Sequence, residues 1–483
     1  MTIGNGSGDW HWEAVIARKE AGRLTRQSAV ITSGLPTAGL PAKLSFTLSL
    51  MDKSLFAPQL AFEPLEIQEG FAEGALKNLL TYLEKNSPFY QRLFRDNSLK
   101  VADVKSLKDL QGLPFTTKDD MQRHNWDFLC VAKNEVREYT ATSGTMGSPV
   151  TIALTESDLL RLAYNEKQSF LCADGKAGDI YQLMLTLDRQ FMAGMAYYSG
   201  IRAMGASVIR TGPGLPQMQW ETMQRLGTNS LVAVPSFLLS LAKWAKSEGI
   251  SLADSGIQKA VCIGENLRNA DFSPSALAEQ IEAVWPIKMY GTYAATELQT
   301  AFTECAAGKG GHHQPDLVLV EIVDDEGNVL PDGQTGEIVV TTLGIEGMPL
   351  LRYKTGDIAA LYAEPCTCGR KSKRLGPVLG RKGQMIKLRG TTVYPPAIFE
   401  VMAAAPYITE YVVELCKDAL GNDDLCLRVS TGMEQTECSA LLAAALQVRL
   451  RVKPRIVFDT LENIRALMTA GQGRKVLRFF DLR

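Results

Sequence analysis

Five short segments of the 483-residue sequence carry residue types that could act on a nucleotide. The first is a run of hydroxyl residues and glycines at positions 139–149, whose N–H and O–H groups could surround phosphate oxygens. No Gly-Lys-Ser/Thr follows at the spacing that a Walker A loop requires. A turn of small residues without any ligand has the same composition, so this run alone does not decide the function.

The other four segments are, in chain order, residues 293–297, residues 351–357, the pair Gly380 and Arg381, and Lys475. Asp357 follows a Thr-Gly pair, where a carboxylate could accept the hydroxyls of a ribose. Taken alone, a Thr-Gly-Asp turn is usually only a turn, and a lysine in a basic segment such as Lys475 is usually solvated. The order of all five segments is more informative than any one of them.

The elements that must position these residues alternate in the middle of the chain. Strands are predicted at residues 182–187, 207–210, 230–234 and 259–263, and helices at residues 216–225 and 236–246. This alternation favours βαβ units and a mostly parallel sheet. From residue 317 the sequence becomes strand-rich, with a turn at Asp332 and Gly333, which predicts an antiparallel β subdomain.

A smaller α+β unit is predicted after residue 380, with extended segments at residues 385–388, 411–415, 424–429 and 455–458 and a helix at residues 435–450. The fold class is therefore α/β. We expect a large N-terminal domain of mostly parallel sheets with helices plus a β subdomain at residues 51–380, and a small, mobile C-terminal domain at residues 381–483. Residues 1–50 are rich in Gly, Ser and Thr, and we expect them to be disordered or foreign to the native protein.

Composition excludes several classes of function. The net charge is −2, from 51 basic and 53 acidic residues, so no basic surface for nucleic acid is indicated. The most apolar stretch, residues 231–245, is interrupted by Pro235, Ser236 and Lys243 and is too short to span a bilayer. No signal-peptide pattern is visible, and nine cysteines are too few for a disulfide framework, so we expect a cytoplasmic protein.

In this order, the five segments resemble the adenylate-forming superfamily of acyl-CoA synthetases, luciferases and adenylation domains. The resemblance is greater to phenylacetate–CoA ligase and its relatives. Further segments similar to that branch are residues 86–90, 113–118, 234–236, 347–353 and 478–483. The resemblance covers residues 51–483 and implies an AMP-forming acid–thiol ligase. Such an enzyme uses ATP to activate an aryl or acyl carboxylic acid as an acyl-adenylate, releases pyrophosphate, and transfers the acyl group to coenzyme A.

The resemblance implies a role for each matching residue. Residues that would hold the β- and γ-phosphates of ATP are Ser143, Gly144, Thr145 and Gly147. Residues that would line the adenine are Gly264, Glu265, Tyr293 and Ala294, and Asp357 and Arg381 would hold the ribose. Glu297 would ligate Mg²⁺, and Lys475 would bridge the reacting carboxylate and the α-phosphate. Magnesium and a lysine suit this chemistry because negative charge builds on the phosphate during the attack.

Three positions depart from the family pattern. Ser148 stands where the phosphate loop usually has a lysine, and Ala294 stands where the Tyr-Gly-x-Thr-Glu motif has glycine. Gly383 occupies the hinge position, usually Asp or Lys, about which the C-terminal domain swings in the family. Glycine still permits the φ/ψ change of a hinge. Since none of the three removes an essential group, we expect function to be retained.

A structural zinc site is predicted at Cys305, His312, Cys366 and Cys368, with His313 as the alternative fourth ligand. Three thiolates and one imidazole form a closed tetrahedral site without an open catalytic position. Relatives of phenylacetate–CoA ligase look similar in carrying such cysteines. The alternative is that these are unrelated buried thiols.

Two other functions remain open at this point. The chain could be an adenylating acyltransferase to an amine, a hydroxyl or a carrier protein, or a catalytically silent nucleotide-binding relative. We expect a small carboxylic acid, ATP and coenzyme A as partners, no nucleic acid or membrane, and a monomer or homodimer. The apolar and aromatic residues Met192, Met195, Tyr197, Tyr198 and Phe237 are candidates for the acid pocket, although such residues are more often core.

Overall fold

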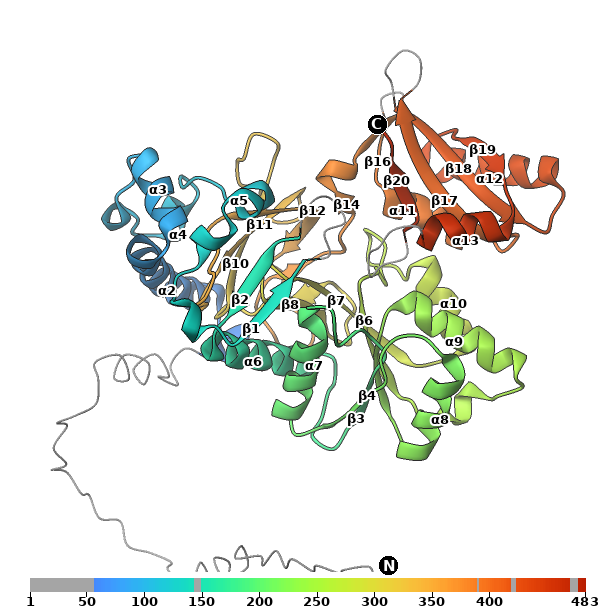
Figure 1. The fold of residues 1–483 in the computed structure, drawn as a ribbon, viewed down its shortest axis with the longest axis horizontal. Coiled ribbons are helices and arrows are strands. Elements are labelled where there is room, and N and C mark those ends of the chain that lie inside the picture. Colours follow the sequence, from blue (N-terminus) through green and yellow to red (C-terminus); the bar gives the residue numbers. More distant parts are fainter. Residues whose placement is uncertain (1–55, 143–148, 389–390, 418–422, 470–476) are drawn as a thin grey trace, which may run out of the picture. The chain divides into compact units, whose positions relative to one another are not determined.

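The computed structural model describes residues 56–142, 149–388, 391–417, 423–469 and 477–483 (Figure 1). The predicted segment 1–50 lies outside these residues. The described chain opens with η3 (Leu60–Phe62), α2 (Leu65–Asn86), α3 (Pro88–Asp96), η4 (Val101–Asp103), α4 (Leu107–Leu110), α5 (Lys118–Arg123), η5 (Asn125–Phe128) and η6 (Lys133–Glu135). Ser87 separates α2 from α3 because its side chain accepts the Tyr90 N–H at 3.4 Å and Pro88 occupies the first turn of α3. Leucines on one face of α2 join the largest apolar core.

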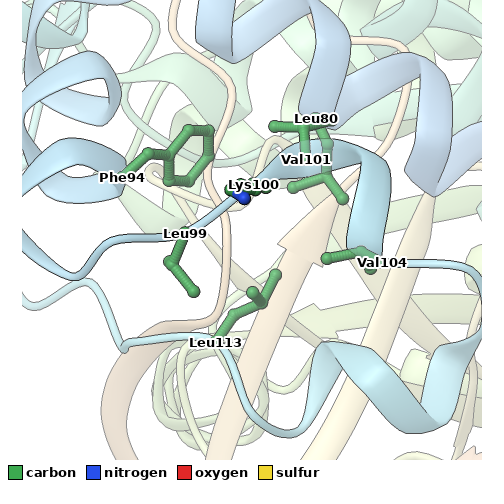
Figure 2. A pocket seen from close by; sticks show the side chains of 7 residues that line it. All are labelled: Leu80, Phe94, Leu99, Lys100, Val101, Val104 and Leu113. Atoms are coloured by element: carbon green, nitrogen blue, oxygen red, sulfur yellow. The ribbon is translucent and has the colours of Figure 1, made fainter.

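A small apolar hollow lies among these first helices (Figure 2). Its lining consists of Leu80, Phe94, Leu99, Lys100, Val101, Val104 and Leu113. Lys100 is the one polar residue of this lining, so the hollow offers no set of groups for phosphates and a magnesium ion. It belongs to the packing of the helical segment.

Five parallel strands form one half of the main sheet. They are β3 (Ile180–Leu183), β4 (Ser207–Arg210), β5 (Ser230–Ala233), β6 (Lys259–Ile263) and β7 (Lys288–Ala295), in the order β4-β3-β5-β6-β7. Helix α6 (Glu156–Cys172) precedes β3. The helices between the strands are α7 (Met192–Ala203), α8 (Pro216–Leu226), α9 (Pro235–Ser247), η7 (Leu252–Ser255) and α10 (Ala276–Val284). The predicted alternation is confirmed. β3 is shorter than predicted because the Leu183 carbonyl accepts the N–H groups of Thr211 and Gly212 and closes the strand there.

Both faces of the inner strands β3, β5 and β6 are buried, which explains their continuous apolar runs. In β5, Leu231 and Ala233 pack into the core beside α9 and α10, whereas Val232 packs into the core beside Tyr197 and Ile201 of α7. Successive side chains of a strand point to opposite faces, so alternate residues of β5 pack into the cores on the two sides of the sheet.

The other half of the main sheet is antiparallel, as predicted. It contains β8 (Thr300–Glu304), β9 (Gly311–His312), β10 (Val318–Val323), β11 (Thr335–Thr342), β12 (Tyr353–Tyr362), β13 (Arg374–Leu375) and β14 (Gly380–Arg381). The strand order is β10-β11-β12-β13-β9-β8-β7, and β14 pairs with β12. β1 (Glu138–Ala141) and β2 (Thr151–Leu154) form a separate hairpin.

A second sheet with the order β19-β18-β17-β20 follows η8 (Lys382–Gln384). Its elements and neighbours are β15 (Ile386–Leu388), β16 (Thr391–Val393), α11 (Pro395–Ala403), β17 (Ile408–Lys417), β18 (Asp423–Thr431), α12 (Gln435–Leu450), β19 (Arg455–Phe458), α13 (Leu461–Thr469) and β20 (Phe479–Asp481). The predicted α+β arrangement is confirmed, whereas the domain boundary at residue 380 stays a prediction. None of the helices in the described residues combines the length and the apolar content that crossing a bilayer needs.

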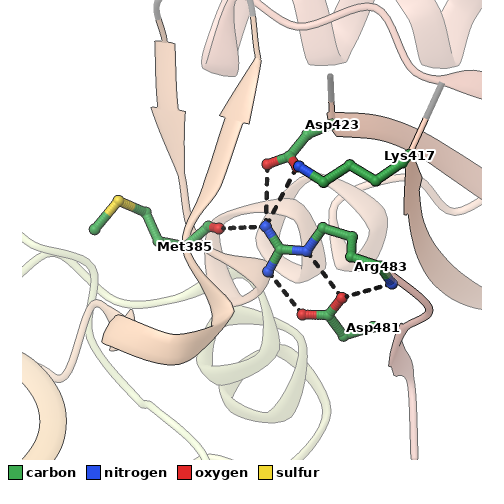
Figure 3. Close-up of polar contacts among 5 residues, drawn as sticks. All are labelled: Met385, Lys417, Asp423, Asp481 and Arg483. Carbon is green, nitrogen blue, oxygen red and sulfur yellow. Dashed lines mark hydrogen bonds and ion pairs between the residues drawn. The ribbon is translucent and has the colours of Figure 1, made fainter. Parts of the chain in front are cut away.

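Arg483 fastens the last strand of this sheet (Figure 3). Its guanidinium donates to Asp481 at 2.7 Å, to Asp423 at 3.1 Å and to the Met385 carbonyl at 3.3 Å. β20 is thereby tied both to the start of β18 and to the residue that precedes β15.

Candidate nucleotide site

The four residues predicted to line an adenine meet at one edge of the main sheet. Gly264 and Glu265 directly follow β6, and Tyr293 and Ala294 lie near the end of its parallel neighbour β7. The carboxyl ends of parallel strands share an edge, where α/β folds bind ligands. Glu265 accepts the Ser236 N–H at 2.8 Å at the start of α9, and Ala294 is exposed.

The predicted ribose residues form a connected group with Tyr293. The Tyr293 hydroxyl donates to Asp357 Oδ2 at 2.8 Å, and Arg381 Nε donates to Asp357 Oδ1 at 3.1 Å. Asp357 and Arg381 are register partners of the antiparallel pair β12 and β14, which is why two residues so distant in sequence meet. The Asp357 side chain is 9% exposed and the Arg381 side chain 46%, so part of the Arg381 side chain remains accessible to a ligand.

The charge state of this group follows from burial. Burial raises the pKa of the Tyr293 phenol well above its usual value, and the neighbouring Asp357 carboxylate raises it further. The phenol therefore stays protonated and acts as a donor. Each Asp357 oxygen already has one donor and retains a free acceptor direction, which suits two hydroxyl groups of a ribose.

Glu297, the predicted magnesium ligand, lies in the turn between β7 and β8 and is 8% exposed. The Tyr353 hydroxyl donates to Glu297 Oε1 at 3.4 Å, and Lys118 Nζ lies 3.7 Å from the same oxygen. Burial raises the pKa of Tyr353, with the Glu297 carboxylate adding to the effect, so this phenol also remains a donor. The ammonium and the phenol thus lie beside the same carboxylate oxygen.

Lys118 lies near Glu297 because the backbone at Thr116 pairs with Tyr353 of β12. Thr116 N–H donates to the Arg352 carbonyl at 3.0 Å, and Lys354 N–H donates to the Thr116 carbonyl at 2.8 Å, so the segment runs beside β12. Thr117 then caps α5 by accepting the Asp120 N–H. Lys118 is the first residue of that helix.

Sequence reasoning missed Lys118 and Tyr353 as site residues, although the segments that contain them contributed to the family resemblance. Nothing in their spacing places them near Glu297, because the contact depends on the pairing of residues 116 and 353. The signal available in the sequence was the lysine at the end of the Leu-Pro-Phe-Thr-Thr-Lys segment.

Several predicted residues lie outside the described part of the chain: Ser143, Gly144, Thr145, Gly147, the departure Ser148, and Lys475. The ends of the phosphate-loop segment are described. Thr142 N–H donates to the Val150 carbonyl, and Val150 N–H donates to the Thr142 hydroxyl, both at 3.0 Å. The β1–β2 hairpin therefore closes the base of the predicted loop.

Gly383, the predicted hinge residue, lies in η8 beside Lys382. Lys382 Nζ contacts Asp325 at 2.8 Å and Glu337 at 3.3 Å. On the other side, a Cβ on Gly380 would lie 2.5 Å from the Cβ of Tyr394, so the Tyr394 ring rests directly on the backbone of β14. The segment around the predicted hinge is thus held by an ion-pair group and by one aromatic ring.

The four predicted metal ligands come together. One ligand atom each of Cys305, His312, Cys366 and Cys368 lies within 4.8 Å of all the others. The Cys305 and Cys366 sulfurs are 3.5 Å apart, and Cys368 Sγ is 3.4 Å from His312 Nε2. A tetrahedral zinc with Zn–S bonds of about 2.3 Å needs ligand atoms roughly 3.7 Å apart, so the spacing fits.

The histidine of this cluster is His312, whereas His313 points elsewhere. The His313 ring nitrogen Nδ1 lies 3.0 Å from the Lys373 carbonyl. Burial lowers the pKa of His312 to about 3, with Arg370 and Arg374 contributing, so its imidazole is neutral and offers a lone pair. Of the two histidines left open by the sequence, the geometry favours His312.

Two candidates for the acid pocket are core residues. Met192 is 6% exposed and Tyr197 is 2% exposed, and both belong to apolar cores. Phe237 is only partly buried, against the core beside α9 and α10. Packing accounts for the burial of Met192 and Tyr197, whereas Met195 and Tyr198 of the same helix are partly exposed. The acid pocket stays a prediction.

Comparisons with known proteins show the family and the fold of this chain. Residues 84–346 match the family model described as AMP-binding enzyme. The phenylacetate-coenzyme A ligase of Thermus thermophilus is 31% identical over 362 residues, which cover 74% of this chain and 80% of that protein. The Escherichia coli phenylacetate-coenzyme A ligase is 26% identical over 84% of this chain and 93% of its own length. The fold is similar to 2-hydroxyisobutyryl-CoA ligase in the postadenylation state, with a TM-score of 0.78, 22% identity, and coverage of 90% of this chain and 93% of that one.

Proposed function

The chain belongs to the AMP-binding enzyme family and is an AMP-forming acid–thiol ligase, and on this premise we propose how its residues divide the reaction. A carboxylate oxygen attacks the α-phosphorus of ATP, the bond to pyrophosphate breaks, and an acyl-adenylate forms. The sulfur of coenzyme A then attacks the acyl carbon, AMP leaves, and the thiol proton is released. The products are an acyl-CoA thioester, AMP and pyrophosphate.

The observation that carries the residue assignment is the hydrogen-bonded group Tyr293–Asp357–Arg381 at the carboxyl edge of the sheet. It offers acceptors for the ribose at one end and an exposed strand end for the adenine at the other. Glu297, with Lys118 beside it, lies in the turn that follows Tyr293. We infer that the base and ribose bind at Gly264, Glu265, Tyr293, Ala294, Asp357 and Arg381.

The phosphate groups would then extend toward Glu297. We propose Glu297 as the ligand of a magnesium ion, which would neutralise charge on the phosphates. Lys118 adds a positive charge at the same place. Ser143, Gly144, Thr145 and Gly147 would donate to the β- and γ-phosphates, and Lys475 would contact the reacting carboxylate and the α-phosphate. The scarcity of histidine is compatible with this scheme, because neither step needs a histidine base.

We propose that Cys305, His312, Cys366 and Cys368 hold a structural zinc ion. The ligands come from the end of β8, from β9 and from the loop before β13, so the metal would clamp three parts of the antiparallel half-sheet. Four protein ligands leave no open coordination position, which excludes this site from the acyl transfer. Free thiols that bind a metal fit a reducing compartment, and we therefore place the protein in the cytoplasm. We propose a monomer or a homodimer.

A panel of carboxylic acids in a pyrophosphate-release assay, with and without coenzyme A, tests the proposal. We expect acid-dependent pyrophosphate release, and formation of a thioester only when coenzyme A is present. Transfer of the acyl group to an amine, a hydroxyl or a carrier protein instead would favour the acyltransferase. A protein that binds ATP but releases no pyrophosphate with any acid would contradict the catalytic assignment.

A further inference from the structure

The loop that carries Cys366 and Cys368 also places a positive charge against the cluster. The Cys366 N–H donates to the Arg370 carbonyl at 3.1 Å, and the Gly369 N–H donates to the Cys366 carbonyl at 3.0 Å. Gly369 has φ +90°, which favours glycine and permits this tight turn. The turn directs Arg370 back toward the cluster, so that its Nη1 lies 3.6 Å from Cys368 Sγ.

The same loop holds the opening segment, defined as residues 56–63. Lys371 N–H and Ser372 N–H both donate to the Ala61 carbonyl, at 2.8 and 3.0 Å. The Arg370 guanidinium lies over the Phe62 ring, 5.0 Å from its centroid. Arg370 therefore has the thiol of Cys368 on one side and the first aromatic ring of η3 on the other.

The charge of the metal site explains why an arginine stands here. Three thiolates, a neutral imidazole and Zn²⁺ carry a net charge of −1. A partly buried anionic site is stabilised by a nearby cation that also donates an N–H to sulfur, as outer partners of metal ligands do. Arg370 meets both needs, and its planar group can stack on Phe62 at the same time.

We propose that Arg370 is the outer partner of the metal site and couples metal binding to the docking of the opening segment. The inference rests on the zinc site proposed above. With the metal bound, the thiolates hold Arg370 in place, and Arg370 with the two following N–H groups holds η3. α2 begins at Leu65, directly after this segment, so the coupling extends to the first helix of the largest core.

The test measures zinc and backbone amide exchange on the full chain rather than activity. We expect about one zinc per chain in the wild-type protein, and faster hydrogen exchange in residues 56–64 and 371–372 after the zinc is removed with a chelator. Arg370→Ala is expected to bind zinc roughly 10- to 100-fold more weakly in competition with a chelating dye. Even at saturating zinc, its residues 371–372 should exchange faster than in the wild type.

Two further variants separate the contributions. Arg370→Lys keeps the charge but loses the planar stack, so it should retain more zinc affinity than Arg370→Ala while the opening segment loosens. Lys371→Ala is the matched control, because it removes a neighbouring, exposed positive charge and leaves the backbone N–H in place. It should match the wild type in both measurements.

Unchanged zinc affinity and unchanged exchange in Arg370→Ala would overturn the coupling while leaving the metal site intact. A wild-type protein without bound zinc would overturn the metal assignment itself, and this is known before any variant is compared. Neither result affects the pyrophosphate-release assay, so failure of the coupling is distinguishable from failure of the ligase assignment.

Discussion

The Tyr293 hydroxyl lies 2.8 Å from Oδ2 of Asp357, and this hydrogen bond joins the two halves of the main sheet at the candidate site. Tyr293 belongs to β7, the last strand of the parallel half, and Asp357 belongs to β12 in the antiparallel half. Tyr293, the residue proposed to line the adenine, thus positions the carboxylate proposed to accept the ribose.

Tyr293→Phe removes the donor and leaves the ring in place. A hydrogen bond to a charged group contributes about 1.5–3 kcal/mol, so we expect the KM for ATP to rise at least roughly 10-fold. Because the contact lies at the nucleoside end, kcat at saturating ATP should change much less. Steady-state pyrophosphate release measures both constants. Tyr407→Phe, at a partly buried tyrosine just before β17, is the control. An unchanged KM for ATP in Tyr293→Phe would contradict the role of Tyr293 in positioning Asp357 for the ribose.

Lys118→Ala removes the ammonium 3.7 Å from Glu297. If this charge stabilises the phosphates in the transition state, kcat for pyrophosphate release should fall on the order of 100-fold, with a smaller change in KM. Lys118→Arg should recover part of the rate. Lys108→Ala, at an exposed lysine of the neighbouring helix α4, should behave as the wild type. A lower melting temperature without a change in kcat would show that Lys118 only holds Glu297.

Lys475→Ala should separate the two half-reactions. We expect acyl-adenylate formation to be abolished, because the lysine would stabilise charge only during the attack on the α-phosphate. Thioester formation from supplied acyl-adenylate and coenzyme A should remain largely intact. Single-turnover assays of each step make the comparison, and equal loss of both steps would contradict the role given to Lys475.

The raised pKa of the buried Glu166 carboxyl leads us to expect that the stability of the protein depends on pH. Burial raises the pKa of this α6 carboxyl to about 8, against the opposing hydrogen bond from Asn165. Between its unfolded pKa of about 4.3 and pH 8, the folded state keeps a proton that the unfolded state has released. The free energy of unfolding should therefore fall as pH rises through this window, by up to about 1.4 kcal/mol per pH unit.

Glu166→Gln should flatten this part of the stability curve, since glutamine carries no titrating proton. Urea unfolding between pH 5 and pH 8 measures the slope, and Glu282→Gln, at an exposed position of α10, is the control. Equal slopes in the wild type and Glu166→Gln would mean that Glu166 is ionised in the folded protein.

Much of the fold was predictable because the sequence patterns that favour its strands are short-range. Residues 207–210 and 259–263 become β4 and β6 with the predicted bounds, since apolar, β-branched runs between polar turns are a short-range signal. The length of β3 was not predictable, because it ends where residues of a later turn bond to Leu183.

The sequence predicted which residues belong to the candidate site, but it did not predict which of them contact one another. Residues 293 and 357 belong to the ordered motifs, and residue 264 was implied by the family resemblance, whereas the proximity of Lys118 to Glu297 depends on a pairing between distant segments. The choice between His312 and His313 also needed the structure. Adjacent residues of an extended segment point to opposite sides, so pairing of β9 with β8 and β13 decides which imidazole meets the thiols.

The close packing of Tyr394 on Gly380 gives this glycine a role that is independent of backbone freedom. Its φ is not in the left-handed region, so alanine would suit the local conformation there. The obstacle is volume: one methyl group would act as a wedge between the Tyr394 ring and the strand whose next residue is Arg381. Residue 380 thus couples the spacing of the segment around the predicted hinge to the position of Arg381, the residue proposed to hold the ribose.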